Sequence, residues 1–395
     1  MRQDSIAFYY DIGCPFAYIA AHRIVKLAEA QQASIEWNPV LLGGLYQHQQ
    51  QSQFPAQQWS TAKAQHNLRQ LHQETQRYKI PFKYNPNHPQ RTVNAMRLLL
   101  CCEKEKRVAL TFALFKAYWQ DGVNFSESEI LDGLCIEFGL QKDCYLNPNI
   151  KMELRKRTDA AAKQGIFGVP TFKVGSEMWW GQDRLLFVKS ALGGERETHF
   201  MQSKKPRSLT LYHDFASPFS YLGVQQMKQF ELETGHQIIL KPILLGALFK
   251  QIGTPMVPLF AMSSDKQQAV FKDLGRWAEW WKIPFSFPSH FPLRSVLPLR
   301  AAIVEPKLTV PLYNAFWAKG LDISKEEVLF DICKQHGLNG QSVIEGAESQ
   351  TTKDQLRQNT QDAMESGVCG VPSWDVDGEI WWGQDRLLSL ASRLA

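Results

Sequence analysis

The chain has 395 residues, of which 44% are hydrophobic and 21% are charged, and its formal net charge is +5. This length suits two or three domains of about 150 residues each, and the composition excludes collagen-like, disordered and low-complexity proteins. No apolar run approaches the ~20 residues that span a bilayer, so we expect no membrane partner. Residues 1–5 lead directly into a strand-like segment and leave no room for a signal peptide, which predicts a cytoplasmic protein.

Charge and cysteine patterns exclude several kinds of site. Lysine and arginine are scattered apart from a short cluster at Lys204–Arg207, so we expect no nucleic-acid partner. A small anionic ligand is compatible with this mildly basic balance. The 7 cysteines include no Cys-x-x-Cys pair, and histidines and cysteines never fall at ligand spacing, so no metal site is predicted.

The sequence contains a long internal repeat. Gly165–Leu186 recurs as Gly367–Leu388 with 14 of 22 positions identical, at an offset of 202. Phe8–Tyr18 matches Leu211–Tyr221 at an offset of 203. Motifs of this length, in the same order and at a near-constant offset, predict two copies of one domain. Two shorter segments also recur at an offset of 203, namely Asn38–Gly43 with Lys241–Gly246 and Lys79–Phe82 with Lys282–Phe285.

The first copy begins with a buried strand at Ile6–Tyr10, followed by an x-Pro turn and a helix with apolar residues at helical spacing. A second strand is predicted at Ser34–Pro39, and residues from about 45 to 164 carry helical periodicity. Pro170–Val174 and Met178–Trp180 are typical of a hairpin, and a last helix follows Arg184. The second copy repeats these elements, with strands at 209–213, 237–242, 372–376 and 380–382 and a helical stretch from about 248 to 366.

The join between the copies follows the last helix of the first one. Gly193 and Gly194 are typical of a helix stop, and a polar stretch comes after them. We therefore expect a first domain at 1–194, a linker at 195–207 and a second domain at 208–395.

Four motifs of the second copy carry a family resemblance: Asp214–Leu222, Lys241–Gly246, Gly367–Pro372 and Trp381–Leu387. Together they resemble the 2-hydroxychromene-2-carboxylate isomerase and kappa-class glutathione transferase family, a DsbA-like branch of the thioredoxin superfamily. The resemblance implies an α/β fold of two tandem thioredoxin-like (DsbA-like) domains, each with a large helical insertion, and glutathione as the cofactor. The family unit is a single domain that commonly dimerises, so the tandem halves are consistent with an intramolecular pseudo-dimer.

Cys14 and Ser217 lie at matching places, where the first strand of each copy turns into a helix. Unpaired backbone N–H groups at a helix start favour a thiolate. The resemblance implies that Ser217 donates a hydrogen bond to the glutathione thiolate; the alternative is a helix N-cap only. Cys14 departs from the family pattern, and Ala17 stands where a resolving cysteine would be needed. Cys14 either acts as a monothiol with a lowered pKa or only packs.

Two valine-proline pairs, Val169-Pro170 and Val371-Pro372, precede the hairpins. In the superfamily the proline at this place is cis, and cis geometry turns the N–H and C=O of the preceding residue outward to pair with the cysteinyl backbone of glutathione. An ordinary proline at a strand entry is the alternative. The proline recurs after the same Gly-x-x-Gly-Val motif in both copies, which favours the cis form.

Further contacts to glutathione follow from the resemblance. It implies that the pairs Gln182-Asp183 and Gln384-Asp385, at the start of the last helix, hold the γ-glutamyl end; capping alone is the alternative. Thr254 stands where the family's Gly-Asn-x-Pro loop has asparagine, and residues 46–55 of the first copy keep no trace of that loop. The tryptophan pairs Trp179-Trp180 and Trp381-Trp382 are expected in the core rather than at the site.

Together these features predict a glutathione-dependent isomerase or transferase acting on small aromatic or carboxylate-bearing electrophiles, with the second copy as the active one. Two alternatives stay open. One is a DsbA-family monothiol redox protein that uses Cys14, and the other is a non-catalytic tandem binding scaffold. Aromatic residues of the second insertion either hold substrate rings or form core, namely Trp277, Trp280, Trp281 and Phe285.

Overall fold

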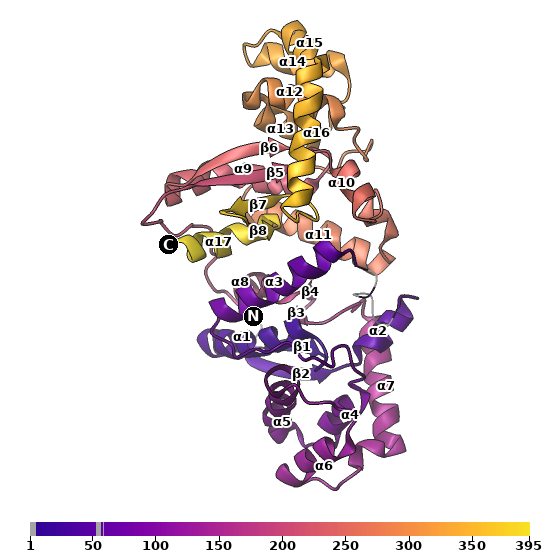
Figure 1. Ribbon diagram of the computed structural model, residues 1–395. Helices are drawn as coiled ribbons and strands as arrows, with labels where there is room; N and C mark the ends of the chain where they lie inside the picture. Colours follow the sequence, from indigo (N-terminus) through magenta and orange to yellow (C-terminus); the bar gives the residue numbers. More distant parts are fainter. Residues whose placement is uncertain (1–4, 53–56, 58) are drawn as a thin grey trace. The chain divides into compact units, whose positions relative to one another are not determined.

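The computed structural model describes residues 5–52, 57 and 59–395 (Figure 1). Residues 1–4, on which the expectation about a signal peptide partly rests, lie outside the described residues, as does part of the segment 46–55. The chain divides into two compact units. The first comprises residues 1–59, 68–197 and 263–269, and the second comprises residues 60–67, 198–262 and 270–395.

The first copy is built on a four-stranded sheet of order β2-β1-β3-β4. Strand β1 (Ser5–Tyr10) runs parallel to β2 (Ser34–Pro39), and helix α1 (Pro15–Gln31) connects them. Strand β3 (Thr171–Val174) pairs antiparallel with β1 and with β4 (Glu177–Trp180). The parallel pair needs a crossover because its strands point the same way, and the apolar face of α1 covers it.

Helices fill the sequence between β2 and β3, as the periodicity predicted. Figure 1 shows α4, α5, α6 and α7 grouped together on the β2 side of the sheet. The remaining helices of the first copy are α2 (Leu42–His48), α3 (Thr61–Arg77), α4 (Val93–Cys101), α5 (Lys104–Lys116), the π-helix η2 (Ala117–Asp121), α6 (Ser128–Glu137), η3 (Cys144–Leu146), α7 (Pro148–Lys163), η4 (Gln182–Arg184) and α8 (Leu185–Ala191).

The second copy has the same sheet, of order β6-β5-β7-β8. Strand β5 (Ser208–His213) runs parallel to β6 (Gln237–Pro242) after helix α9 (Pro218–Thr234), and it runs antiparallel to β7 (Ser373–Val376), which pairs with β8 (Glu379–Trp382). Its other helices are α10 (Leu245–Gln251), η5 (Pro258–Ala261), α11 (Ser264–Trp280), α12 (Val296–Val304), η6 (Pro306–Leu308), α13 (Thr309–Trp317), α14 (Glu326–Gln335), α15 (Gly340–Glu348), α16 (Gln350–Glu365), η7 (Gln384–Arg386) and α17 (Leu387–Leu394).

The sheet register determines where a site can form. Tyr9 of β1 lies opposite Thr171 of β3, and Tyr212 of β5 lies opposite Ser373 of β7. The loop that leaves the end of β1 or β5 therefore meets the residues that lead into β3 or β7. These are the Cys14 and Ser217 turns on one side and the valine-proline pairs on the other.

The predicted fold class is confirmed: each copy is an α/β thioredoxin-like domain with a large helical insertion. One local detail differs from the expectation. Gln182-Asp183 and Gln384-Asp385 lie in short 3-10 helices that precede α8 and α17, rather than in the last helices themselves. Among the described residues, no helix is both long enough and apolar enough to cross a membrane.

Candidate active site

Ser217 is the N-cap of α9 and touches the segment before Pro372. Its backbone is extended, with φ −101° and ψ 118°, and its Oγ accepts a hydrogen bond from the Ser220 N–H at 3.2 Å. The same hydroxyl donates to the carbonyl of Val371 at 3.1 Å. Ser217 is only 5% exposed. It therefore caps the helix and also reaches the other predicted site element.

The peptide bonds before Pro170 and Pro372 are cis, which confirms the prediction; two more cis bonds, before Pro89 and Pro292, were not foreseen. The backbone N–H groups of Val169 and Val371 donate no hydrogen bond within the described residues, although both residues are buried. Buried N–H groups without a partner are rare in proteins. Each therefore offers a donor to a ligand carbonyl.

Cys14 repeats this arrangement in the first copy with different chemistry. Its thiol donates to the carbonyl of Val169 at 3.3 Å, but it makes no capping bond to α1. Burial raises the pKa of the Cys14 thiol to about 12, because the thiolate would lose its hydration, and the nearby Asp11 adds to the shift. The N–H groups at the start of α1 oppose the shift but do not overcome it. This direction is opposite to the lowered pKa that the monothiol alternative requires.

A buried aspartate supports the turn in each copy, a role that was not predicted from the sequence. Asp11 accepts hydrogen bonds from the N–H of Gly13 at 2.9 Å, the N–H of Leu42 at 2.8 Å and the Thr92 hydroxyl at 2.8 Å. Asp214 accepts from the N–H of Ala216 at 2.9 Å and of Leu245 at 2.8 Å. The available signal was that Asp stands three residues before Cys14 and before Ser217 in the repeated motif.

The loop after the hairpin is tied directly to the cis-proline. The N–H of Gly383 donates to the carbonyl of Pro372 at 2.9 Å, so Gln384 and Asp385 begin beside that residue. Gln384 is buried, and its Oε1 accepts from Gln226 of α9 at 3.0 Å. The carboxylate of Asp385 lies 3.4 Å from the Arg386 Nε.

The first copy holds its loop differently. Gly181 donates to the carbonyl of Pro170 at 2.9 Å, as in the second copy. The side chain of Gln182, however, donates to Glu74 at 3.0 Å, and Arg23 donates to the Gln182 carbonyl at 2.8 Å. Asp183 pairs with Arg184 at 3.1 Å. This buried ionic network replaces the neutral glutamine pair of the second copy.

One tryptophan of each pair lies beside the cis-proline, which corrects the expectation that both belong to the core. Trp179 is 5% exposed, but Trp180 is 43% exposed. A Cβ at Gly168 would lie 2.8 Å from the Trp180 indole nitrogen. Gly370 contacts Trp382 in the same way. Neighbouring strand residues point to opposite faces, so this placement was open to sequence reasoning.

No hydrogen bond among the described residues joins the other predicted contact residues to Ser217 or Val371. Thr254 is half-buried, and its N–H donates to the carbonyl of Phe249 at 2.9 Å. Trp277 and Trp280 are buried, so they form core rather than a substrate wall. Phe285 is half-buried and stacks against Trp317 at 6.1 Å. Among the residues that the structure describes, no group of three or more His, Cys, Asp or Glu side chains is arranged to hold a metal ion.

Comparisons with known proteins match both copies. The family model of the DSBA-like thioredoxin domain covers residues 5–193 and 208–395. The relatives are about half as long as this chain. The 2-hydroxychromene-2-carboxylate isomerase of Sphingobium xenophagum is 27% identical over 198 residues, which cover 48% of this chain and 98% of that protein. The isomerase of the same name from Pseudomonas putida is 30% identical over 193 residues, covering 48% and 94%.

A second group of relatives consists of glutathione transferases. Glutathione S-transferase kappa 1 of Rattus norvegicus is 25% identical over 206 residues, which cover 47% of this chain and 90% of that protein. Among solved structures, a selenomethionine 2-hydroxychromene-2-carboxylate isomerase aligns with a TM-score of 0.43 and 26% identity, over 47% of this chain and 93% of that chain.

Proposed function

Because the chain belongs to the DsbA-like thioredoxin family, as a tandem member of the branch that holds 2-hydroxychromene-2-carboxylate isomerases and kappa-class glutathione transferases, we propose that it is a glutathione-dependent isomerase or transferase. Its substrates would be small aromatic or carboxylate-bearing electrophiles. The observation that carries the proposal is the Ser217 hydroxyl at the start of α9, in contact with the residue before a cis-proline.

The residues around Ser217 fit glutathione by their hydrogen-bonding groups. The Val371 N–H has no partner among the described residues, and it suits the carbonyl of a cysteinyl backbone. The Val371 carbonyl accepts from Ser217, a bond that a bound tripeptide would replace. The hydroxyl proton would then turn to the sulfur while the carbonyl accepts the cysteinyl N–H. This exchange keeps every buried polar group paired, which limits its cost.

Glutathione, when bound, supplies a thiol that adds reversibly to a conjugated double bond. The Ser217 hydroxyl and the N–H groups that open α9 would hold that sulfur deprotonated near neutral pH. Val371 and Pro372 would fix the backbone next to it, and Asp385 would face the γ-glutamyl ammonium. Gln384 would act as a positioning residue, since its side chain is held by Gln226. Binding both reactants at fixed positions makes the addition effectively intramolecular.

The second copy is the better candidate for this role. In the first copy a thiol with a raised pKa occupies the place of the hydroxyl, and a larger sulfur atom lies against Val169. The seven cysteines are free thiols, which agrees with the reducing cytoplasm where glutathione is abundant. No observation on the described residues favours the monothiol alternative, because burial raises the pKa of the Cys14 thiol instead of lowering it.

Calorimetric titration with glutathione tests the proposal. Wild type, Ser217→Ala and Asp385→Ala are compared, with Cys14→Ala as the matched change in the first copy. We expect the two second-copy variants to lose roughly tenfold or more in affinity, as removal of a charge-assisted hydrogen bond does. Cys14→Ala should leave the second-copy affinity unchanged. Equal affinity in all four proteins would reject the site.

The ionisation of bound glutathione gives a second readout. The ultraviolet absorbance of the thiolate, followed against pH, should show a lowered thiol pKa on the wild-type protein. In Ser217→Ala the pKa of the bound thiol should rise towards its value in solution, because only the N–H groups of α9 remain to stabilise the thiolate. A pKa that stays as low as in wild type would remove Ser217 from the proposed role and leave only the helix start.

A further inference from the structure

We infer that the first copy carries a second small-molecule site, for an aromatic phosphate monoester, in the cavity beside the edge strand β2. This cavity measures about 670 Å³ and extends from the start of β1 along β2 to helices α5 and α7. It reaches Ser5, at one end of β1, whereas Cys14 follows the other end. The two ends of the strand are about 17 Å apart, so the inference does not rest on the proposed glutathione site.

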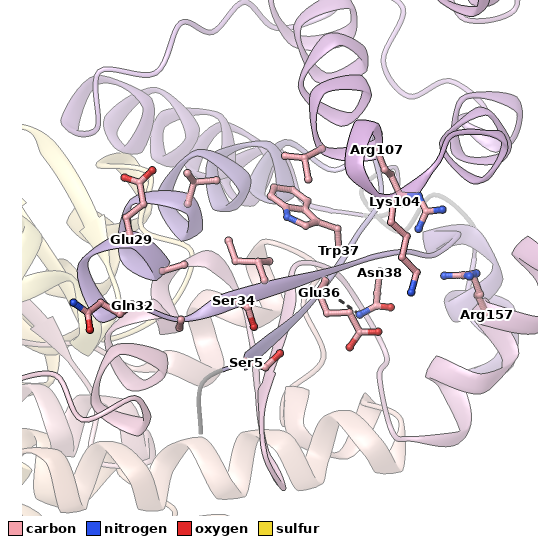
Figure 2. Close-up of a pocket in the computed structure, with 15 residues that line it drawn as sticks. Ser5, Glu29, Gln32, Ser34, Glu36, Trp37, Asn38, Lys104, Arg107 and Arg157 are labelled. Carbon is pink, nitrogen blue, oxygen red and sulfur yellow. Dashed lines mark hydrogen bonds between the residues drawn. The ribbon is translucent and has the colours of Figure 1, made fainter. Parts of the chain in front are cut away.

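Three cations converge at one end of the cavity. Figure 2 shows the side chains of Lys104, Arg107 and Arg157 directed into the same space beside Asn38 and Glu36, while Glu29 lies at the far end. Lys104 and Arg107 come from α5, and Arg157 comes from α7. No described carboxylate lies within ion-pair distance of Lys104 or Arg107. Three positive groups around one space suit a doubly charged anion with several oxygens better than a single carboxylate.

Arg107 is the buried member of this group. It is only 9% exposed, and its Nε and Nη2 donate to the carbonyls of Leu99 at 2.9 Å and Cys102 at 3.1 Å. These bonds orient the guanidinium but do not neutralise it. Burial and the nearby charge of Arg157 both lower its pKa. A buried cation beside a like charge is unfavourable unless an anion joins them.

The acidic residues near this space do not pair with all three cations. The Arg157 Nε pairs with Glu153 at 2.6 Å on the same helix, and its Nη groups make no other hydrogen bond within the described residues. Glu36 lines the cavity from β2 but forms no ion pair with any of the three cations among the described residues. The Asn38 amide donates to the Glu36 carbonyl at 3.1 Å, which closes part of the strand edge to another strand.

An apolar wall adjoins the cations and indicates the rest of the ligand. Val25, Ile35, Trp37 and Val108 line the cavity. The Trp37 ring packs edge-on against Phe8 at 5.2 Å, which holds it in place. A ligand with a phosphate group among the cations and an aromatic body against this wall uses both halves of the cavity.

The second copy shows that the fold does not need the charge of Arg157. Helix α16 matches α7 at an offset of 202, so Asn359 stands in the place of Arg157. Its amide donates to the carbonyl of Pro242 at 3.1 Å and packs against the chain. Arg157 is therefore present in the first copy alone. This agrees with a ligand site that only the first copy carries.

Calorimetric titration with phenyl phosphate tests the inference, at a pH above about 7 where a phosphate monoester is doubly charged. The chain offers matched controls, because Lys106 and Arg155 lie on the same two helices and do not line the cavity. We expect Lys104→Gln and Arg157→Asn each to weaken binding by about tenfold. Lys106→Gln and Arg155→Asn should bind as wild type does. Inorganic phosphate should bind more weakly than phenyl phosphate.

Three outcomes would overturn the inference: no binding at millimolar phenyl phosphate, equal losses in the cavity and control variants, or inorganic phosphate binding as tightly as the aromatic ester. Lys104 is exposed, so its substitution does not threaten folding and keeps the test valid. Glutathione affinity, measured in the same variants, should not change. A failure of the glutathione site would therefore leave this result untouched.

Discussion

The hydroxyl of Ser217 donates a hydrogen bond of 3.1 Å to the carbonyl of Val371, although 154 residues separate the two in the chain. The same geometry brings the Cys14 thiol to the carbonyl of Val169 at 3.3 Å. The two copies thus hold different polar atoms in one backbone setting. The consequences for binding and stability can be measured separately.

Ser217→Ala is expected to lower the free energy of unfolding by about 1–2 kcal/mol, since it removes an N-cap and a buried hydrogen bond. Urea unfolding measures this loss. Saturating glutathione at 100 times its dissociation constant should stabilise wild type by about 2.7 kcal/mol but the variant by much less. If glutathione stabilises the variant as much as it stabilises wild type, Ser217 only caps the helix.

Cys14 is expected to react slowly with iodoacetamide at neutral pH. Its pKa is raised to about 12 by burial, so the thiolate fraction is very small and increases only as pH rises towards that value. Mass spectrometry of the peptide that contains Cys14, after timed alkylation, measures the rate. Unfolded protein in urea is the control and should react much faster. Rapid labelling at mildly acidic pH would contradict this expectation.

His213 makes the second copy sensitive to acid. Burial lowers its pKa from 6.5 to about 3, so the unfolded chain binds a proton more readily than the folded one. Its contribution to stability is present above pH 6.5 and is lost as pH falls towards 3. The expected slope is about 1.4 kcal/mol per pH unit within this window.

The control for His213 is the comparison of His213→Phe with His336→Phe. His336 is exposed, so its substitution should keep the acid slope of wild type. His213→Phe should flatten the slope, because the neutral ring has no proton to bind. Unfolding by urea at a series of pH values distinguishes the two. Identical slopes in both variants would assign the acid sensitivity to other groups.

Gly370→Ala is expected to destabilise the second copy by about 1–3 kcal/mol through overpacking. The added Cβ would lie 2.8 Å from atoms of the Trp382 indole, next to the cis-proline. The matched control is Gly275→Ala in α11, where a Cβ meets no atom within 4 Å. That change should be neutral or stabilising, since alanine favours helix. If the two substitutions change the free energy of unfolding equally, the Trp382 side chain moves aside at no cost in stability.

Much of the fold could be predicted from the sequence because the information is local. The strands predicted at Ser34–Pro39 and Gln237–Pro242 have the same bounds in the structure. The repeat aligned Cys14 with Ser217 in sequence, and the proline motifs indicated the cis bonds that the structure contains. Each of these features depends on residues within one turn, one strand or one repeated motif.

What only the tertiary structure decided depends on residues far apart in the chain. Asp11 meets Leu42 and Thr92, and Arg107 comes near Arg157, through the packing of helices on a sheet. Burial likewise decides the direction of the Cys14 pKa, because the loss of hydration raises it by more than the N–H groups at the helix start lower it. Local periodicity tells which face of an element is apolar, but not which distant side chains that face will meet.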